Sequence, residues 1–416
     1  MAQNYRAKVI SNIKWSNNSH PKSQFSLPYL QRLHLFAAIL ENLDLLEPPK
    51  RKKEMAAGDE KVEIWIKERT TVKPAKPTPS KRLWSSNLDL IVGRIHLLTV
   101  YFYRWPANGC PDFFEPGAMK EALGRALVTR FKCGGVCLGT GVFHTLSDGL
   151  SSLHFINTWS DIARGLSVAV PPFIDRTLLR ARDPPTPTFL HSEYSLPPKL
   201  LVPSSEAKRA PMTAMLKITS DQLSLLKAKS KHEGSTYEVL AAHVWRCACK
   251  ARGLPDDQPT KLYVATDGRA RLCPPLPPGY LGNVVFTATP MAESGDLQNE
   301  PLSNSAKRIH STLARMDDKY LRSALDFLEC QKDLSRLVRG PTYFASPNLN
   351  INSWTRLPLH EADFGWGRPV HMGPASILYE GTVYILPSPN KDRTLSLAVC
   401  LDGEHLPLFK KLLYDI

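Results

Sequence analysis

A histidine, an aspartate and a glycine are closely spaced in the run His144-Thr-Leu-Ser-Asp148-Gly149. An imidazole titrates near neutral pH and can take a proton from a weak nucleophile such as an alcohol. An apolar, glycine-rich run over residues 133–143 precedes this hexapeptide, and a helical pattern follows it. We therefore expect His144 at the end of a strand, where it can face a ligand, and Asp148 at the start of a helix, where it can brace the turn.

By itself the hexapeptide is a weak signal, because such patterns arise by chance and a buried core histidine would also fit. Its meaning depends on a second motif more than 200 residues later, Asp363-Phe-Gly-Trp-Gly367. Gly365 and Gly367 predict tight turns, and a tryptophan such as Trp366 packs more often than it reacts. We therefore interpret Asp363 and its neighbours as a structural motif that supports the chemistry of the first.

The composition limits the classes of function. Of 416 residues, 43% are hydrophobic and 22% are charged, which is typical of a globular protein long enough for two domains. The net charge of +14 is not accompanied by a basic helix or an aromatic–basic motif, so we predict no nucleic-acid partner. No apolar run predicts a membrane span, the cysteines lack zinc-type spacing and no secretory signal is visible, so we predict a cytoplasmic protein.

Alternating helical and strand-like patterns predict an α/β fold in two layered domains. We expect an extension over residues 1–54 that is disordered, an N-terminal domain over 55–182, a proline-rich crossover over 183–212 and a C-terminal domain over 213–416. The expected strands are residues 62–66, 94–104, 213–218, 262–266, 284–288, 381–386 and 394–401. The expected helices are 120–128, 149–165, 220–230 and 235–251, the last with a capping box of Ser235 and Glu238.

The two motifs together resemble the paired signatures of the BAHD acyl-CoA-dependent acyltransferases of plants. The likeness extends over residues 81–104, 131–165 and most of 213–416, and within that family it is greatest to the shikimate O-hydroxycinnamoyltransferases. The resemblance implies a chloramphenicol-acetyltransferase-like architecture of two domains, with mixed sheets flanked by helices and the active site at the domain interface. It also implies transfer of a p-coumaroyl or caffeoyl group from coenzyme A to shikimate in phenylpropanoid and lignin biosynthesis.

The resemblance assigns a role to each candidate residue. His144 is the general base, and Trp354 donates its indole N–H to the developing oxyanion. Asp148 is expected to pair with Arg269 or Arg271 and to brace the histidine turn together with Gly149. Arg339 is expected to bind the acceptor carboxylate, and Thr99 and Tyr101 to line the acceptor pocket. The acyl-CoA segments are Ser235, Thr236, Tyr237 and Glu238; Asp267, Gly268, Arg269, Ala270, Arg271, Leu272 and Cys273; and Ser353, Trp354, Thr355 and Arg356.

Partners and cofactors follow from the same resemblance. We expect a monomer whose partners are the small molecules hydroxycinnamoyl-CoA and shikimate, in a ternary complex without a covalent acyl-enzyme, a bound cofactor or a metal. The chain contains neither the Gly-x-Ser-x-Gly motif of hydrolases nor the His-Glu-x-x-His motif of zinc proteases, which agrees with this expectation.

One departure from the family pattern affects the N-terminal domain. After Val128 the sequence continues directly with Thr129, where the family has several dozen further residues, so we expect this domain to be incomplete. A smaller departure is His371, which stands where the family usually has phenylalanine. Two alternatives follow: a catalytically impaired relative that binds CoA esters or partner proteins, and an acyltransferase with another acceptor, such as quinate or an amine.

Overall fold

The computed structural model describes residues 83–106, 109–110, 112–115, 126–130, 134–201 and 210–416. The expected extension over 1–54, the strand at 62–66 and the first part of the helix at 120–128 lie outside these residues. Among the residues that are described, no helix is long and apolar enough to cross a membrane.

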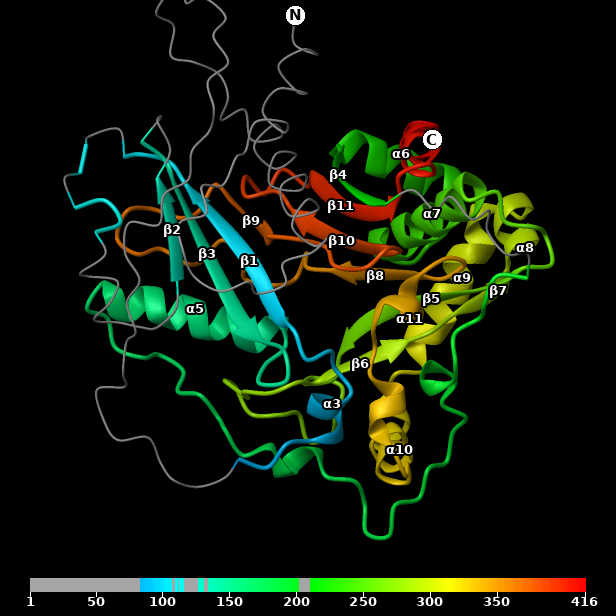
Figure 1. Ribbon diagram of the computed structural model, residues 1–416, viewed down its shortest axis with the longest axis horizontal. Helices are drawn as coiled ribbons and strands as arrows, with labels where there is room; N and C mark the ends of the chain where they lie inside the picture. The colour runs from blue at the N-terminus through cyan, green and yellow to red at the C-terminus, as the bar shows by residue number, and fades with distance from the viewer. Residues whose placement is uncertain (1–82, 107–108, 111, 116–125, 131–133, 202–209) are drawn as a thin grey trace, which may run out of the picture.

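A four-stranded antiparallel sheet forms the smaller part of the molecule (Figure 1). Its order is β2 (Ala126–Arg130), β3 (Val136–Phe143), β1 (His96–Tyr103) and β9 (His371–Pro374). Strand β9 comes from the C-terminal half of the chain and pairs with β1, with Tyr101 opposite Met372. The two halves of the sequence therefore share this sheet.

Strand β2 corrects one prediction. The helix expected over residues 120–128 is wrong for its last three positions, because residues 126–130 form a strand. Val128 lies opposite Leu138 of β3 in antiparallel register. The β-branched residues Val128 and Thr129 favour a strand wherever a neighbouring edge is available, and the local helical pattern gives no sign of that neighbour.

A seven-stranded mixed sheet forms the larger part. Its main path runs β4 (Pro211–Ile218), β11 (Leu395–Asp402), β10 (Thr382–Pro387), β8 (Leu349–Ser353), β5 (Pro259–Asp267) and β6 (Val285–Ala288), and β7 (Met291–Glu293) pairs with β5. Strand β8 pairs in parallel with both β10 and β5, and the other pairs are antiparallel. The strands predicted in this half are confirmed to within a few residues.

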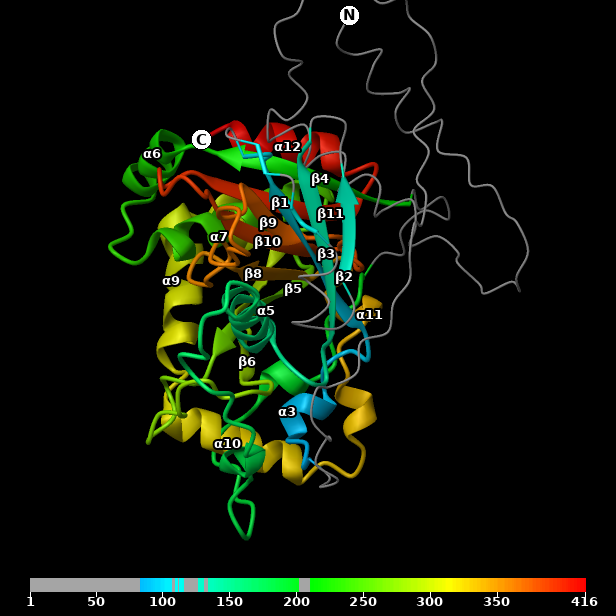
Figure 2. The same cartoon turned by 90° about the vertical axis from the view of Figure 1, so that its left-hand side faces the viewer.

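Helices cover both sheets. Helix α5 (Gly149–Ala163) lies beside the four-stranded sheet, and α6 (Ser220–Ser230), α7 (Thr236–Ala251), α9 (Leu302–Ala314) and α12 (Leu406–Tyr414) gather at the larger one (Figures 1 and 2). The capping box of Ser235 and Glu238 at the start of α7 is confirmed. Helix α10 (Asp318–Glu329) is a further helix of 12 residues. Shorter helices connect the elements: α3 (Asn87–Leu90), α8 (Ser294–Asn299), α11 (Pro341–Phe344) and the 3-10 turns at Arg176–Leu179, Ser192–Tyr194 and Leu334–Leu337.

The hydrophobic core has two main parts, which lie on opposite faces of the larger sheet. Along β11, Leu397 and Val399 belong to the core that contains α7, whereas Ala398 and Cys400 belong to the core that contains β1, β3 and α5. This alternation follows from the two-residue period of a strand. The larger sheet is therefore the middle layer, with helices on one face and the smaller sheet and α5 on the other.

Candidate active site

His144 follows directly after the last residue of β3, as the sequence predicts. Its N–H donates to the carbonyl of Ile95 at 2.9 Å, and its own carbonyl accepts from Nδ2 of Asn283 at 2.8 Å. The main chain is thus held from both halves of the protein. Burial lowers the pKa of His144, and the nearby Asp148 carboxylate only partly opposes this. The imidazole is therefore neutral at physiological pH, the form that can accept a proton.

Asp148 caps α5 and forms a buried ion pair with Arg269. The two guanidinium nitrogens of Arg269 lie 2.8 and 3.0 Å from the two carboxylate oxygens. The backbone N–H groups of Ser151 and Val284 also donate to this carboxylate, each at 3.0 Å. Because these donors use both oxygens, Asp148 fixes the histidine turn to the larger half of the protein.

The prediction of Arg269 or Arg271 as the partner is confirmed for Arg269. Arg271 instead donates to the carbonyls of Leu313 and Met316, at 3.2 and 2.9 Å. Sequence reasoning could not choose between the two arginines, because the choice depends on where the C-terminal end of α9 lies in the folded chain.

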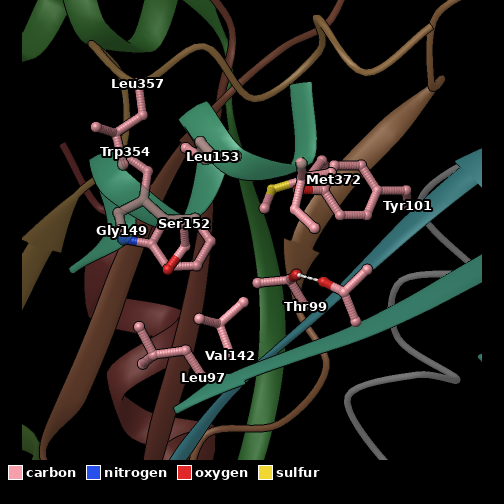
Figure 3. Close-up of a pocket in the computed structure, with 12 residues that line it drawn as sticks. Leu97, Thr99, Tyr101, Val142, Gly149, Ser152, Leu153, Trp354, Leu357 and Met372 are labelled. Carbon is pink, nitrogen blue, oxygen red and sulfur yellow. Dashed lines mark hydrogen bonds between the residues drawn. The ribbon is translucent and has the colours of Figure 1, made fainter. Parts of the chain in front are cut away.

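A small cavity lies next to the histidine turn (Figure 3). It brings together four predicted residues, Thr99, Tyr101, Gly149 and Trp354. Its volume is about 30 Å³, which is enough for about one water molecule. The remaining lining residues are Leu97, Thr140, Val142, Ser152, Leu153, Ile156, Leu357 and Met372.

The polar groups of this cavity are few. Thr99 Oγ1 and Thr140 Oγ1 lie 2.7 Å apart and share a hydrogen bond, drawn in Figure 3. His144 is not itself a lining residue, but in the chain it lies between Val142 and Gly149, which are. The cavity is thus mostly apolar and is bounded by the end of β3 and the start of α5.

Trp354 follows β8 and is held at its backbone by the carbonyl of Ile385, at 2.9 Å. Its ring packs edge-on against Tyr384, with the centroids 5.0 Å apart. The neighbouring Ser353 and Thr355 hydroxyls share a hydrogen bond of 2.9 Å, and Arg356 is exposed. Only Trp354 of this predicted segment lines the cavity.

Arg339 has a buried guanidinium group that the protein only partly satisfies. One terminal nitrogen donates to Thr287 Oγ1, and the guanidinium lies over the ring of Tyr194 at 6.0 Å. Nε and Nη2 are buried, and neither has a hydrogen-bond partner among the described residues. Buried polar groups are nearly always hydrogen-bonded, so these two nitrogens are unsatisfied donors, although Arg339 is not among the residues that line the small cavity.

Arg339 and His144 are attached to the same short segment. The N–H of Arg339 donates to the carbonyl of Ile91 at 3.3 Å, and the N–H of His144 donates to that of Ile95. Residues in and just before strand β6 contact both of them: Thr287 on β6 accepts a hydrogen bond from Arg339, and Asn283, which precedes β6, donates one to the carbonyl of His144. The backbones at the candidate base and at the candidate anion-binding group are therefore anchored to the same segment, residues 91–95.

The second motif, Asp363–Gly367, forms a tight turn that is held by its own hydrogen bonds. One carboxylate oxygen of Asp363 accepts from the N–H groups of Gly365 and Gly367, at 2.8 and 3.0 Å. Both glycines have positive φ values, of 101° and 97°, which L side chains rarely adopt. Trp366 packs against Phe113 and Phe114 in the core between the two sheets. These contacts agree with the structural interpretation.

The other predicted acyl-CoA residues lie at the larger sheet. Ser235 and Thr236 are exposed at the start of α7, while Tyr237 is half-buried, with its hydroxyl 3.5 Å from the carbonyl of Ile351. Asp267, the last residue of β5, and the following Ala270 and Cys273 are exposed, whereas Leu272 is buried. Gly268 is close-packed, because an added Cβ would lie 2.6 Å from the Phe286 ring. None of these residues lines the small cavity.

Three contributors were not predicted. Asn283 holds the carbonyl of His144, Thr140 shares the hydrogen bond of Thr99, and Met372 closes the cavity from β9. A strand alternation around Thr140 could have indicated a side chain on the same sheet face as Thr99. The positions of Asn283 and Met372 depend on pairings between distant segments, which no local pattern reveals.

Comparison with known proteins identifies the family. The model described as the Transferase family matches residues 61–129 and 125–416. The chain is 49% identical to a shikimate O-hydroxycinnamoyltransferase of Nicotiana tabacum, over 85% of this chain and 100% of that protein. The chain belongs to the BAHD acyltransferase family. Another member, a hydroxycinnamoyl-CoA:5-hydroxyanthranilate N-hydroxycinnamoyltransferase of Avena sativa, is 45% identical over the same shares of the two chains.

The BAHD fold is also shown by a solved structure. Vinorine synthase superposes with a TM-score of 0.64 at 16% identity, covering 82% of this chain and 95% of that one. This likeness confirms the predicted chloramphenicol-acetyltransferase-like architecture, with mixed sheets and flanking helices. At this level of identity it bears on the fold alone.

The BAHD comparison also bears on the incomplete N-terminal domain. The alignment with the tobacco protein is 436 positions long, whereas 85% of 416 residues is about 354 residues. About 80 aligned positions therefore have no counterpart in this chain. The two segments matched by the family model meet at residues 125–129, which lie in and just before β2. This is where the sequence predicts the gap.

Proposed function

We propose that this acyltransferase moves a hydroxycinnamoyl group, p-coumaroyl or caffeoyl, from coenzyme A to a hydroxyl group of shikimate, as part of phenylpropanoid and lignin biosynthesis. The observation that carries the proposal is the state of Arg339, whose buried guanidinium keeps two nitrogens without a partner among the described residues. A carboxylate that binds there forms charge-assisted hydrogen bonds. Shikimate has a carboxylate and ring hydroxyls, and the shared support of Arg339 and His144 suits both.

In the proposed reaction the acceptor hydroxyl attacks the thioester carbonyl carbon while the imidazole of His144 takes the hydroxyl proton. The lowered pKa of His144 keeps the imidazole neutral and ready to accept it. The carbonyl oxygen becomes an oxyanion, which the indole N–H of Trp354 stabilises. The carbon–sulfur bond then breaks, and the coenzyme A thiolate leaves with the proton from His144. Asp148 and Arg269 hold the histidine turn and do not take part in proton transfer.

The proposal includes the other parts of the predicted enzyme. Thr99 and Tyr101 line the acceptor side of the cavity, and the segments that begin at Ser235, Asp267 and Ser353 contact the acyl-CoA. The enzyme acts as a cytoplasmic monomer with acyl-CoA as its co-substrate, and it needs no metal or bound cofactor for the reaction.

The test is to incubate the purified full chain with p-coumaroyl-CoA and shikimate and to follow free thiol and ester product. We expect turnover, and we expect His144→Ala to lower kcat by roughly 10²–10⁴ because the general base is lost. Arg339→Ala should raise the KM for shikimate, while Arg336→Ala, an exposed arginine nearby, should leave it unchanged. A folded wild-type protein without turnover, or an unchanged KM in Arg339→Ala, would contradict the proposal.

A second candidate is a catalytically impaired relative that binds CoA esters or partner proteins. The observation that favours it is the cavity of about 30 Å³ together with the absence of about 80 aligned positions. Small-molecule pockets usually have volumes of about 300–1,000 Å³. Calorimetry with p-coumaroyl-CoA distinguishes the two candidates, because this one predicts binding without product for shikimate, quinate and an aromatic amine alike. Product with quinate or the amine alone would instead identify a different acceptor.

A further inference from the structure

A cluster of two histidines and one glutamate lies away from the candidate active site. His232 precedes α7, Glu238 lies in the first turn of α7, and His310 lies on α9. The possible ligand atoms of the three side chains all lie within 4.8 Å of one another. Figure 1 shows α7 and α9 at the larger sheet, on the other side of the molecule from α5.

We propose that His232, Glu238 and His310 form a binding site for Zn²⁺ or a similar divalent transition metal. Imidazole nitrogens and carboxylate oxygens are the ligands that Zn²⁺ takes in proteins, at about 2.0–2.2 Å. Ligands at these bond lengths lie roughly 3.3 Å apart in a tetrahedron. Here His232 Nε2 is 2.9 Å from Glu238 Oε2, and His310 Nδ1 is 3.2 Å from Glu238 Oε1. Each histidine nitrogen is therefore about as far from a carboxylate oxygen as two zinc ligands are from each other, and the two histidine nitrogens lie within 4.8 Å of one another.

The burial of the three side chains suits a site that opens on one side. The side chains of His232 and Glu238 are 8% and 10% exposed, whereas that of His310 is 54% exposed. Three protein ligands leave one coordination position for water. The buried side chains of His232 and Glu238 are held in place by the protein, and the exposed side chain of His310, on α9, can complete the set of ligands.

The surroundings hold the inner ligands in place. The N–H of Ser235 donates to Glu238 Oε2 at 2.9 Å, and such outer contacts orient metal ligands. Gly234 packs so closely that a Cβ at this position would collide with both Glu238 and His232.

A metal ion bound at this site would connect two helices. Helices α7 and α9 already pack against each other, and a bound ion would add a link between the start of α7 and the middle of α9. Because a ligand that binds only the folded state stabilises it, Zn²⁺ should raise the melting temperature. This inference is independent of the proposed reaction.

The test uses the tag-free full chain, stripped of metal with a chelator and titrated with Zn²⁺ by calorimetry. We expect His310→Ala to bind one Zn²⁺ per chain fewer than wild type and to lose the Zn²⁺-dependent rise in melting temperature. His154→Ala, a half-buried histidine on α5, is the matched control and should bind as wild type does. His310→Cys supplies another zinc ligand and should restore the lost equivalent.

Cobalt gives a second readout that does not depend on stability. Co²⁺ bound by histidine and carboxylate gives d–d absorption without the charge-transfer band of a thiolate, which distinguishes this cluster from the cysteines. Because His310 is exposed, its substitution should leave the circular dichroism spectrum unchanged. Equal Zn²⁺ binding and equal cobalt spectra in wild type and His310→Ala would overturn the proposal.

Discussion

The seven-stranded and four-stranded sheets differ in how completely the described residues pack on their faces and pair with their edges. The larger sheet has α7 and its neighbours on one face and the core shared with β1, β3 and α5 on the other. The smaller sheet has β2 at one edge, beside the place where about 80 positions of the tobacco relative have no counterpart. Its other edge is β9, which the C-terminal half supplies.

The candidate site is divided between these unequal parts. Trp354, Arg269 and Arg339 belong to the well-supported half, whereas His144, Thr99 and Tyr101 lie on or beside the smaller sheet. The missing positions therefore affect the half that carries the base, and the ion pair of Asp148 and Arg269 links that half to the other. Three experiments test this difference, from the largest expected effect to the smallest.

Removing the link should have the largest effect. Arg269→Ala leaves the carboxylate of Asp148 buried without its cation, and breaking a buried ion pair from one side costs about 3–5 kcal/mol. We expect a corresponding loss in the free energy of unfolding, measured by urea denaturation. Arg271→Ala is the control, because it removes only bonds to two backbone carbonyls. Equal losses in the two variants would show that the ion pair does not hold the halves together.

Matched truncations in the two sheets should differ in how far their effects extend. Leu138 on β3 and Leu397 on β11 are both fully buried, and each change to alanine should cost about 2–5 kcal/mol. We expect Leu138→Ala to accelerate amide hydrogen exchange in β1, β2 and β3 without changing β10 or β11, because the smaller sheet can open locally. Leu397→Ala should accelerate exchange in both sheets, since β11 borders both cores. Identical exchange patterns would remove the distinction between the sheets.

The third effect is a loss of folding stability at acidic pH, which we expect from His371. His371 on β9 is buried beside Phe102, its Nε2 has no hydrogen-bond partner among the described residues, and burial lowers its pKa to about 4. The unfolded chain takes up a proton near pH 6.5 and the folded chain does not, so stability should fall as the pH drops from about 6.5 to 4. The loss is on the order of 3 kcal/mol, at 1.36 kcal/mol per pKa unit. His371→Phe should flatten this part of the stability profile, measured by thermal unfolding across that pH range, and an unchanged slope would contradict the assignment.

Much of the fold could be predicted because its signals are local. The caps at Asp148 and Ser235 and the alternating strands of the C-terminal half mark their own elements. The paired motifs identified the family, since a histidine turn and a two-glycine turn rarely occur together by chance. The family resemblance also indicated the gap after Val128.

What could not be predicted depends on contacts between distant segments. The local pattern predicts a helix over residues 126–128, because their partner, β3, becomes a neighbour only in the folded chain. The choice of Arg269 over Arg271 depends on the carbonyls of Leu313 and Met316, which hold the second arginine elsewhere. The roles of His144, Trp354 and Arg339 in the reaction stay predictions.

Strand β9 has a consequence for how the protein is made. Strand β1 lies among the first described residues, but one of its two neighbours is completed only at Pro374, close to the end of the chain. During synthesis, the open side of β1 must wait until residues 371–374 have left the ribosome. A ribosome stalled before residue 371 would therefore leave one side of β1 unpaired, and two halves expressed separately would have to associate before β9 could pair with β1.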